Sequence, residues 1–408
     1  MIADGPRVAV VGGSLGGLLT ALVLGDAGCD VQVFERSRTP LEGRGAGIVL
    51  HPITVRYLQA NRALNLARVS AASRTLRYLT AEGDLLLEQE IRYLFTSYAT
   101  LYGALVERLE ADRYHLDTEC VGLEQEQDRV LVRFADGGRS SFDLVVGADG
   151  IRSTVRGVLF PDVAQVYAGY VAWRGTLPER ELSARARGTL LGALTYFVGF
   201  RTHILSYSIP SEHRNRRAGR LTNWVWYRNV AIDALDDLMT DAHGVRHDLS
   251  LPPGAASASH VAALRATARD TLPPAFADLV EAAPEPFLQV IVDIAVPRMA
   301  VGRVCLIGDA AFALPPHGAA GTAKAAADAH ALAEAVAATD GDVPEALRGW
   351  EPQQRRIGAS AFARARAIGG AVQDTGSYRP GDPEVAFGLS SPGDHNFPDD
   401  LVAADAPR

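Results

Sequence analysis

The segment RVAVVGGSLGGLLTALVLGDAGCDVQVFE, residues 7–35, joins two short apolar stretches through a glycine-rich turn. Residues 7–11 are rich in valine, which is typical of a buried parallel strand. Residues 18–27 predict a helix, and the glycine that follows ends it. Residues 31–34 predict a second strand, with Glu35 at its carboxyl end. A strand, a turn, a helix and a strand within about 30 residues form a βαβ unit.

The glycine turn has the features of a binding site for a dinucleotide pyrophosphate. Such a site needs a tight turn, close approach of the backbone and a helix N-terminus whose free N–H groups face the phosphates. Gly12 and Gly17 take the first and third glycine positions of the motif, and Ser14 takes the second. Glu35 stands where an acid accepts hydrogen bonds from ribose hydroxyls. A turn that binds nothing is the alternative, and the combination with Glu35 disfavours it.

Two further segments directly follow predicted strands. DGIRSTVR, residues 149–156, follows a strand expected at 143–148, and GDAA, residues 308–311, follows one expected at 303–307. A lone aspartate at the end of a strand is usually a helix cap. Three such segments in this order favour a nucleotide cofactor instead.

The third segment also suggests how a cofactor would be held. Asp309 can accept hydrogen bonds from the hydroxyl groups of a ribityl chain. Gly318 to Gly321 would open an alanine-rich helix that reaches about residue 338. The positive end of that helix can stabilise an anionic flavin ring.

Composition excludes several classes of protein. The 408 residues carry 40 basic and 48 acidic side chains, a net charge of −8, which disfavours sequence-independent binding of nucleic acid. The three cysteines have no metal-ligand spacing, so neither a metal site nor a disulfide framework is expected. Residues 8–25 are uncharged but contain five glycines, which indicates a strand, a turn and a helix rather than a membrane span. We expect a cytoplasmic protein.

Together, the three segments resemble the single-component FAD-dependent aromatic hydroxylases, the p-hydroxybenzoate hydroxylase-like monooxygenases. They span nearly the first 330 residues. The resemblance implies an α/β fold in which a Rossmann-like FAD-binding domain is interleaved with an α+β substrate domain built on an antiparallel sheet. Aromatic and β-branched runs between residues 165 and 295 agree with such a sheet.

The expected domains follow from this pattern. Residues 1–165 form the first part of the FAD-binding domain, and residues 166–295 form the substrate domain. Residues 296–374 return to the FAD-binding domain. Residues 375–408 are rich in proline, glycine and aspartate and are expected to form an irregular C-terminal tail.

Shorter segments are similar to the 2,6-dihydroxypyridine 3-monooxygenase subfamily. They are YAGYVAWRG (167–175), TSY (96–98), AGIV (46–49), PHGAAG (316–321), DLMTD (237–241) and PGDP with AFGL (380–389). The resemblance implies hydroxylation of an electron-rich, hydroxylated aromatic or N-heteroaromatic ring, using NADH or NADPH and O2 through a flavin C4a-hydroperoxide. A homodimer is a possible assembly. A phenolic or polyketide natural-product intermediate is the alternative substrate.

The resemblance also implies which residues bind the cofactor. The ADP part would lie against the glycine turn and the end of the second strand, and Asp149 and Arg152 belong to a segment associated with both FAD and NAD(P)H. Asp309 would bind the ribityl chain, and residues 316–321 would border the flavin edge. The cofactor-binding residues are thus Gly12, Ser14, Leu15, Gly17, Glu35, Arg36, Ile48, Val49, Tyr98, Asp149, Arg152, Asp309, Pro316, Gly318 and Gly321.

The sequence departs from the family pattern at several of these places. Ser14 replaces a glycine, and Tyr98 stands where the family often has an arginine. Phe312 and Ala323 stand where a histidine and an asparagine are often found. These departures concern contacts at the edge of the flavin more than FAD binding itself.

The substrate site is expected to contain a base that deprotonates a ring hydroxyl and so makes the ring more nucleophilic. Histidine has the suitable pKa, and His51, His213 and His317 are the candidates in that order. Each could instead be a structural or solvated histidine. Side chains expected to line the pocket are Arg174, Tyr196, Tyr207 and Trp226. Aromatic residues at strand spacing are also common in protein cores.

Two other functions are suggested by parts of the sequence. Trp224-Val225-Trp226 is similar to a motif of flavin-dependent halogenases, but those enzymes rely on a lysine between the FAD domain and the tryptophans. Of the 40 basic residues, 39 are arginine and the one lysine, Lys324, follows the third segment. The halogenase interpretation therefore fails. A flavoprotein that only sequesters an aromatic ligand remains open, and turnover would exclude it.

The sequence predicts that the purified protein is yellow and holds about one non-covalent FAD per chain, as expected for one dinucleotide site. Flavin released by heat and measured by its absorbance gives the ratio. A colourless protein that cannot be reconstituted with FAD would contradict the whole interpretation.

Overall fold

A sheet of mostly parallel strands forms one half of the molecule and contains the strand before the glycine turn and the strand before Gly308-Asp309. The computed structural model describes residues 5–41, 47–61, 65–211 and 219–398. Within these residues the sheet runs in the order β17 (Ala300–Val301), β18 (Val304–Leu306), β10 (Leu144–Gly147), β1 (Arg7–Val11), β2 (Asp30–Phe34) and β6 (Tyr114–His115). This is the doubly wound arrangement expected of a dinucleotide-binding domain.

The strands predicted for this sheet are confirmed to within a residue at either end. β1 is buried on both faces from Val8 onward, which explains its continuous apolar run. The helix after the glycine turn, α1 (Leu15–Asp26), begins three residues earlier than expected because the turn itself needs only Gly12 to Ser14. Gly28, at φ +89°, follows the end of this helix.

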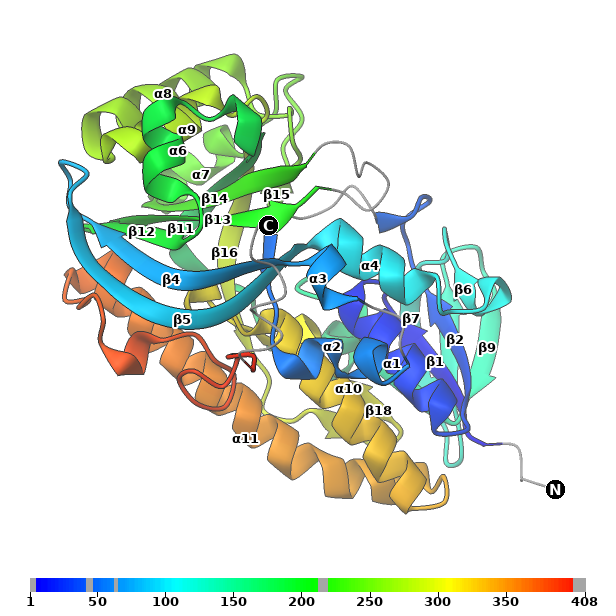
Figure 1. Cartoon of the computed structure of the whole chain (residues 1–408). Helices are drawn as coiled ribbons and strands as arrows, with labels where there is room; N and C mark the ends of the chain where they lie inside the picture. The colour runs from blue at the N-terminus through cyan, green and yellow to red at the C-terminus, as the bar shows by residue number, and fades with distance from the viewer. Residues whose placement is uncertain (1–4, 42–46, 62–64, 212–218, 399–408) are drawn as a thin grey trace.

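Layers on both faces bury this sheet. The helices α1 and α10 (Gly321–Ala338) contact each other, and α10 lies beside α11 (Val343–Gly369), as Figure 1 shows. A small sheet of β7 (Cys120–Gln125), β8 (Val130–Phe134) and β9 (Arg139–Phe142) packs on Phe34 of β2 through Phe134 and Phe142. The shorter helices are α2 (Pro52–Ala60), α3 (Leu66–Val69), α4 (Tyr98–Val106) and α5 (Thr154–Leu159).

The second half of the molecule is built on a ten-stranded sheet of the described residues. Its order is β15 (Ser250–Leu251), β16 (Phe287–Ala295), β11 (Val166–Pro178), β14 (Arg220–Asn229), β13 (Thr202–Pro210), β12 (Leu194–Gly199), β4 (Ala71–Leu79), β5 (Leu85–Ser97) and β3 (Gly47–Val49), with β19 (Phe312–Ala313) paired to β16. The predicted antiparallel sheet corresponds to β11 through β16. The sheet extends further because β12 pairs in parallel with β4.

That parallel pair brings the hairpin of β4 and β5, which lies within residues 1–165, into the ten-stranded sheet. Tyr78 and Phe95 on the hairpin belong to the same apolar cluster as Tyr196 and Leu205 on β12 and β13. The sheet therefore crosses the boundary expected at residue 165, and the domain limits themselves remain a prediction.

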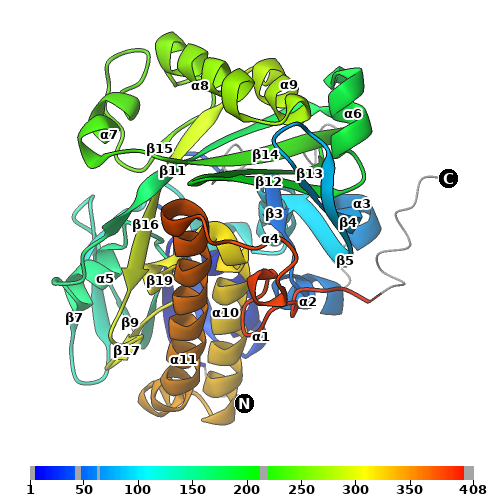
Figure 2. The same ribbon diagram turned by 90° about the vertical axis from the view of Figure 1, so that its left-hand side faces the viewer.

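The two faces of the ten-stranded sheet have different partners. The helices α6 (Ala184–Leu190), α7 (Ile232–Leu238), α8 (Ala258–Thr271) and α9 (Pro274–Ala282) cover one face, and the FAD-type domain lies under the other (Figure 2). Along β14, Trp224 and Trp226 point to the helices, whereas Val225 and Tyr227 point to the other face. This alternation is the ordinary period of a strand.

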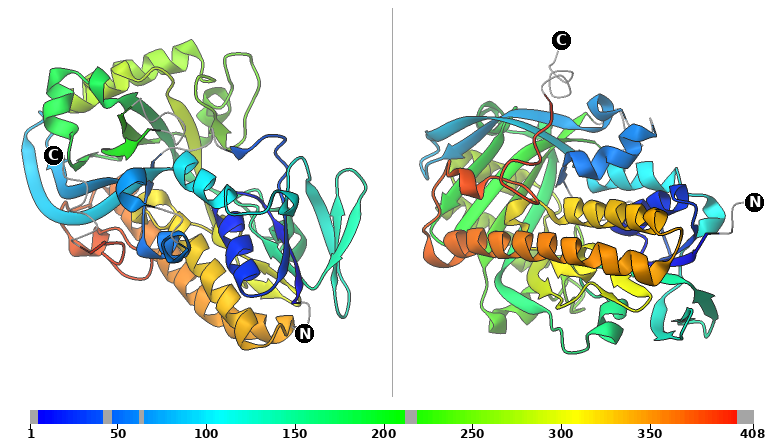
Figure 3. Two further views of the ribbon diagram at one scale, coloured as in Figure 1. Left: turned by 45° about the vertical axis from the view of Figure 1, so that its right-hand side comes forward. Right: turned by 90° about the horizontal axis from the view of Figure 1, so that it is seen from below.

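Residues 375–398 contain little regular structure, as expected, but they are packed against the protein. Phe387, His395 and Phe397 are buried, and the Phe397 N–H donates to the Arg92 carbonyl (3.0 Å). A 3-10 turn, Pro383–Val385, is part of this segment. Figure 3 shows the segment running along the lower side of the β4–β5 hairpin.

The described part of the chain gives three negative findings. No helix in it is long and apolar enough to cross a membrane. No group of three histidine, cysteine or acidic side chains in it could hold a metal ion. Its cysteines, Cys29, Cys120 and Cys305, are buried and unpaired.

Candidate active site

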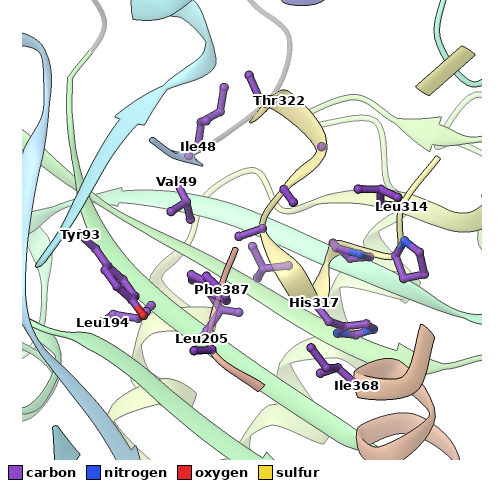
Figure 4. A pocket seen from close by; sticks show the side chains of 18 of the residues that line it. Ile48, Val49, Tyr93, Leu194, Leu205, Leu314, His317, Thr322, Ile368 and Phe387 are labelled. Carbon is purple, nitrogen blue, oxygen red and sulfur yellow. The ribbon is translucent and has the colours of Figure 1, made fainter. Parts of the chain in front are cut away.

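One cavity of about 720 Å³ joins the two halves of the molecule. It begins at the glycine turn, passes the carboxyl ends of β1, β10 and β18, and ends against the ten-stranded sheet. Ligands of doubly wound folds bind at this edge of the sheet. Figure 4 shows Tyr93, Leu194 and Leu205 on one side of the cavity, with Leu314, His317 and Thr322 across from them.

The glycine turn leaves no room for side chains. Gly12 has φ +104°, and a Cβ atom on it would lie 2.5 Å from the carbonyl oxygen of Ala148. A Cβ on Gly17 would lie 1.8 Å from the carbonyl oxygen of Gly12. These contacts are the physical reason for glycine at both positions.

The N-terminus of α1 is arranged for an anion. Ser14 is the N-cap residue, but its hydroxyl bonds to the Tyr98 hydroxyl (2.8 Å) and does not cap the helix. The first turn of α1 contains no acidic residue. Its N–H groups therefore remain available for phosphate oxygens. Ser14, Leu15 and Tyr98 all line the cavity.

Glu35 supports the turn from the neighbouring strand. Its carboxylate accepts hydrogen bonds from the N–H groups of Gly13 (2.8 Å) and Ser37 (2.9 Å). A carboxylate has further lone pairs that can accept from a ribose. Arg36 is exposed, and neither residue lines the cavity.

Asp149 organises the start of α5. Its carboxylate accepts from the Ser153 hydroxyl (2.5 Å) and the Val155 N–H (3.1 Å), and burial raises its pKa. Arg152 forms an ion pair with Asp248 (3.2 Å) outside the cavity. Gly150 is the residue of this segment that lines the cavity. A cofactor role for Asp149 and Arg152 remains a prediction.

Asp309 lies on the cavity wall in a 3-10 turn, Gly308–Ala310, that follows β18. The side chain is exposed to the cavity, but its depth within the protein raises its pKa to about 6, and the positive charge of Lys324 opposes that rise. Lys324 itself is paired with Asp328 (2.5 Å), and both side chains are fully buried. The Asp328 carboxylate also accepts from the Gly308 N–H (3.0 Å). The ion pair therefore holds the turn that presents Asp309.

The turn Pro316–Gly318 and the start of α10 form the opposite wall from Ile48 and Val49 (Figure 4). Pro316 and Gly321 line the cavity, whereas Gly318 is buried behind it and its carbonyl accepts from the Gly388 N–H (3.1 Å).

These residues fit FAD. A glycine turn too tight for a Cβ atom and the free N–H groups of α1 suit the pyrophosphate, and the carboxylate of Asp309 suits the ribityl hydroxyls. The wall at Pro316–Gly321 would border the ring. The same cavity then continues along the sheet, where a substrate would lie next to that ring.

The expected substrate-binding side chains divide into two groups. Arg174, Tyr196 and Tyr207 line the cavity. Trp226 does not, and that expectation is corrected: its indole N–H donates to the Thr202 hydroxyl (2.9 Å) among the residues under the helices. Since side chains alternate along a strand, the next residue, Tyr227, lines the cavity instead.

The histidine candidates also lie in different places. His51 is buried behind the wall, where its Nε2–H donates to the Ala319 carbonyl (2.9 Å). His213 lies outside the described residues. His317 lines the cavity, and its Nε2 is 2.8 Å from the Tyr170 hydroxyl. His51 therefore supports the turn that is predicted to border the flavin, next to which Ala319 has the left-handed φ of +52°.

Sequence reasoning missed His203, which lines the cavity from β13. Its ring stacks on Tyr227, with the ring centroids 4.4 Å apart, and lies 5.2 Å from the ring of His317. The signal was available, because His203 and Tyr207 share the parity of one strand face.

Burial keeps both cavity histidines neutral. It lowers the pKa of His317 to about 3, and burial together with His317 lowers the pKa of His203 far below its usual value. Both pKa values lie below the near-neutral range expected of a base, and a catalytic role for His317 remains a prediction.

Comparisons with known proteins give a consistent result. The model of the family described as FAD binding domain matches residues 6–222 and 291–361, and a second model, FAD binding domain-like, matches residues 167–293. The chain is 40% identical to 2,6-dihydroxypyridine 3-monooxygenase of Paenarthrobacter nicotinovorans over 94% of this chain and 96% of that protein. It is 28% identical to 3-amino-4-hydroxybenzoate 2-monooxygenase of Streptomyces cremeus over 89% of this chain and 86% of that protein.

A solved structure is similar over nearly the whole length. The structure of 2,6-dihydroxypyridine-3-hydroxylase from Arthrobacter nicotinovorans superimposes with a TM-score of 0.90 and 38% identity, covering 96% of this chain and 98% of that one. The likeness therefore extends over both sheets.

Replacing Asp309 tests its place beside the ribityl chain. Asp309→Ala should weaken FAD binding roughly 10- to 150-fold at pH 8, since a hydrogen bond to a charged group contributes about 1.5–3 kcal/mol. With the pKa of Asp309 at about 6, its carboxylate is protonated at lower pH, so the difference from the parent should shrink at pH 5. Fluorescence titration of the apoprotein with FAD measures both values.

Asp278→Ala is the matched control, because Asp278 pairs with Arg185 and lies outside the cavity. Equal FAD affinity of parent and Asp309→Ala would remove Asp309 from the site.

Replacing His51 separates a supporting role from a base. His51→Ala should lower the free energy of unfolding by about 1–3 kcal/mol, because the partly buried Ala319 carbonyl loses its donor. The pH profile of turnover should keep its shape, and His51→Gln should restore part of the stability. A loss of about 100-fold in turnover with unchanged stability and FAD affinity would instead make His51 the base.

Proposed function

The chain belongs to the FAD binding domain family and is an FAD-dependent aromatic-ring monooxygenase, and from this we propose that it hydroxylates a small, electron-rich, hydroxylated N-heteroaromatic ring similar to 2,6-dihydroxypyridine. NADH or NADPH serves as reductant and O2 as co-substrate. The observation that carries the proposal is the 40% identity to 2,6-dihydroxypyridine 3-monooxygenase over 94% of the chain.

The lining of the cavity supports a flat aromatic substrate. Beyond the flavin-facing turn the wall is made largely of aromatic and aliphatic side chains, including Tyr93, Tyr196 and Phe387. Tyr93 and Phe387 stack on each other, with the ring centroids 5.7 Å apart. Such walls bury the faces of a ring and leave orientation to a few polar groups.

The bound FAD would supply, after reduction, an electrophilic oxygen derived from O2. The residues of the chain exclude water and orient the substrate. The apolar wall excludes water from the reacting ring, and the Tyr78–Tyr378 hydrogen bond (2.9 Å) attaches residues 375–398 over the sheet end of the cavity. Arg174 and the neutral histidines orient the ring through its oxygen atoms.

A phenolic acid is the second candidate substrate. The relative from Streptomyces cremeus is named for 3-amino-4-hydroxybenzoate, which carries a carboxylate. Arg174 faces the cavity, and among the described residues no carboxylate pairs with it. Its guanidinium can therefore bind either a substrate carboxylate or an ionised ring oxygen.

The test compares the two classes on the FAD-loaded protein. We expect 2,6-dihydroxypyridine to stimulate NAD(P)H oxidation with a kcat/KM roughly 10- to 100-fold higher than 3-amino-4-hydroxybenzoate, because a carboxylate costs more to desolvate and Arg174 is the one cationic side chain among the described residues that line the cavity. Oxygen from ¹⁸O-labelled O2 should appear in the product.

The opposite preference would favour the phenolic acid. NAD(P)H oxidation without label in any product would mean that the protein sequesters a ring and does not hydroxylate it.

A further inference from the structure

The two cavity histidines are held from behind by different partners. His317 contacts the Tyr170 hydroxyl, and His203 Nδ1 lies 3.0 Å from Nε2 of Gln373. We propose that Gln373 is a positioning residue that keeps the proton of His203 on Nε2, so that His203 donates a hydrogen bond to a ring oxygen of the substrate and is not its base. The inference rests on the proposed function in one respect, namely that the substrate carries a ring oxygen.

Gln373 is rigidly placed. It belongs to a π-helical turn, Gly370–Thr375, that follows α11 and ends at Gly376 with φ +65°. Its side chain is fully buried. Its backbone carbonyl accepts hydrogen bonds from the Asn229 side-chain amide (2.8 Å) and from Arg201 Nε (3.3 Å). π-helical turns are frequent at functional sites.

The contact determines which nitrogen of His203 carries the proton. An amide nitrogen only donates, so Nδ1 must accept, and a neutral imidazole then has its proton on Nε2. Rotating the carboxamide by half a turn would leave both of its N–H groups unpaired in a buried place. The present orientation leaves the Oε1 atom unpaired among the described residues, and buried acceptors tolerate this better than donors do.

The surroundings of His203 keep its imidazole neutral, so that it acts as a hydrogen-bond donor. The titratable groups that face it are Tyr227, which stacks on its ring, and His317, which lies beside it. Burial and the neighbouring His317 oppose a positive charge on His203. No carboxylate of the described residues contacts it to stabilise an imidazolium.

The neighbouring groups are donors as well. Burial raises the pKa of Tyr170, so its hydroxyl keeps its proton and can donate to His317 Nε2, which lies 2.8 Å away. Arg174, on the same strand face as Tyr170, has only donors. A wall of donors suits an oxygen that has already lost its proton.

The experiment replaces Gln373 in the FAD-loaded protein and follows the ionisation of bound 2,6-dihydroxypyridine by its ultraviolet absorbance. In Gln373→Glu the carboxylate accepts a hydrogen bond from Nδ1–H of His203. The proton of the neutral imidazole then lies on Nδ1, and Nε2 has none to donate. We expect the bound ring to ionise at a pH about 1–2 units higher than in the parent, the equivalent of one hydrogen bond to a charged group. Gln373→Met, which has no amide, should shift it in the same direction and remains informative if the Glu variant fails to fold.

Gln354 offers a matched control, since it is a buried glutamine on α11 that does not line the cavity. Gln354→Glu should leave the ionisation unchanged. A lower ionisation pH or faster hydroxylation in Gln373→Glu would make His203 a base and overturn the proposal.

A second measurement does not depend on the substrate. The ¹⁵N chemical shifts of the His203 ring in the FAD-loaded protein, assigned with His203→Gln, should show a protonated Nε2 and an unprotonated Nδ1. The reverse pattern would overturn the proposal. If the protein shows the expected ¹⁵N pattern but does not turn over 2,6-dihydroxypyridine, the assigned tautomer stands and only the proposed substrate is rejected.

Discussion

The close approach of the Gly12 turn to Ala148 is the contact on which the rest of the site depends. The Gly12 N–H donates to the Phe34 carbonyl (2.8 Å), and the Ala148 N–H donates to the Val11 carbonyl (2.8 Å). These bonds align the carboxyl ends of β1, β2 and β10 at one edge. A side chain at Gly12 would separate the turn from β10 and move the N-terminus of α1 away from the cavity.

The second organising feature is the alternation of side chains in the ten-stranded sheet. One face buries Trp173, Trp224 and Trp226 under the helices, and this provides the apolar core that holds the sheet flat against them. The other face carries tyrosines, histidines and Arg174 and is the wall of the cavity. One set of strands thus provides both stability and the surface for a ligand.

Burial also determines the chemistry of that wall. An imidazole in a tightly packed, carboxylate-free environment loses affinity for protons, so His203 and His317 remain neutral. Gln373, the partner of His203, then decides the tautomer of that ring. The polarity of the site follows from residues that do not face the ligand themselves.

The sequence by itself determined the doubly wound sheet and the glycine turn, because Gly12, Gly17 and Glu35 belong to one βαβ unit whose geometry is local. The cofactor followed from the resemblance of three segments to a known family. It also predicted Arg174, Tyr196 and Tyr207 as side chains of a pocket, and all three line the cavity. Only the tertiary structure decided that Trp226 faces the helices, that β4 and β5 complete the second sheet, and that His203 is paired with Gln373. Those outcomes depend on strand register and on contacts between residues as many as 170 positions apart, which no local pattern encodes.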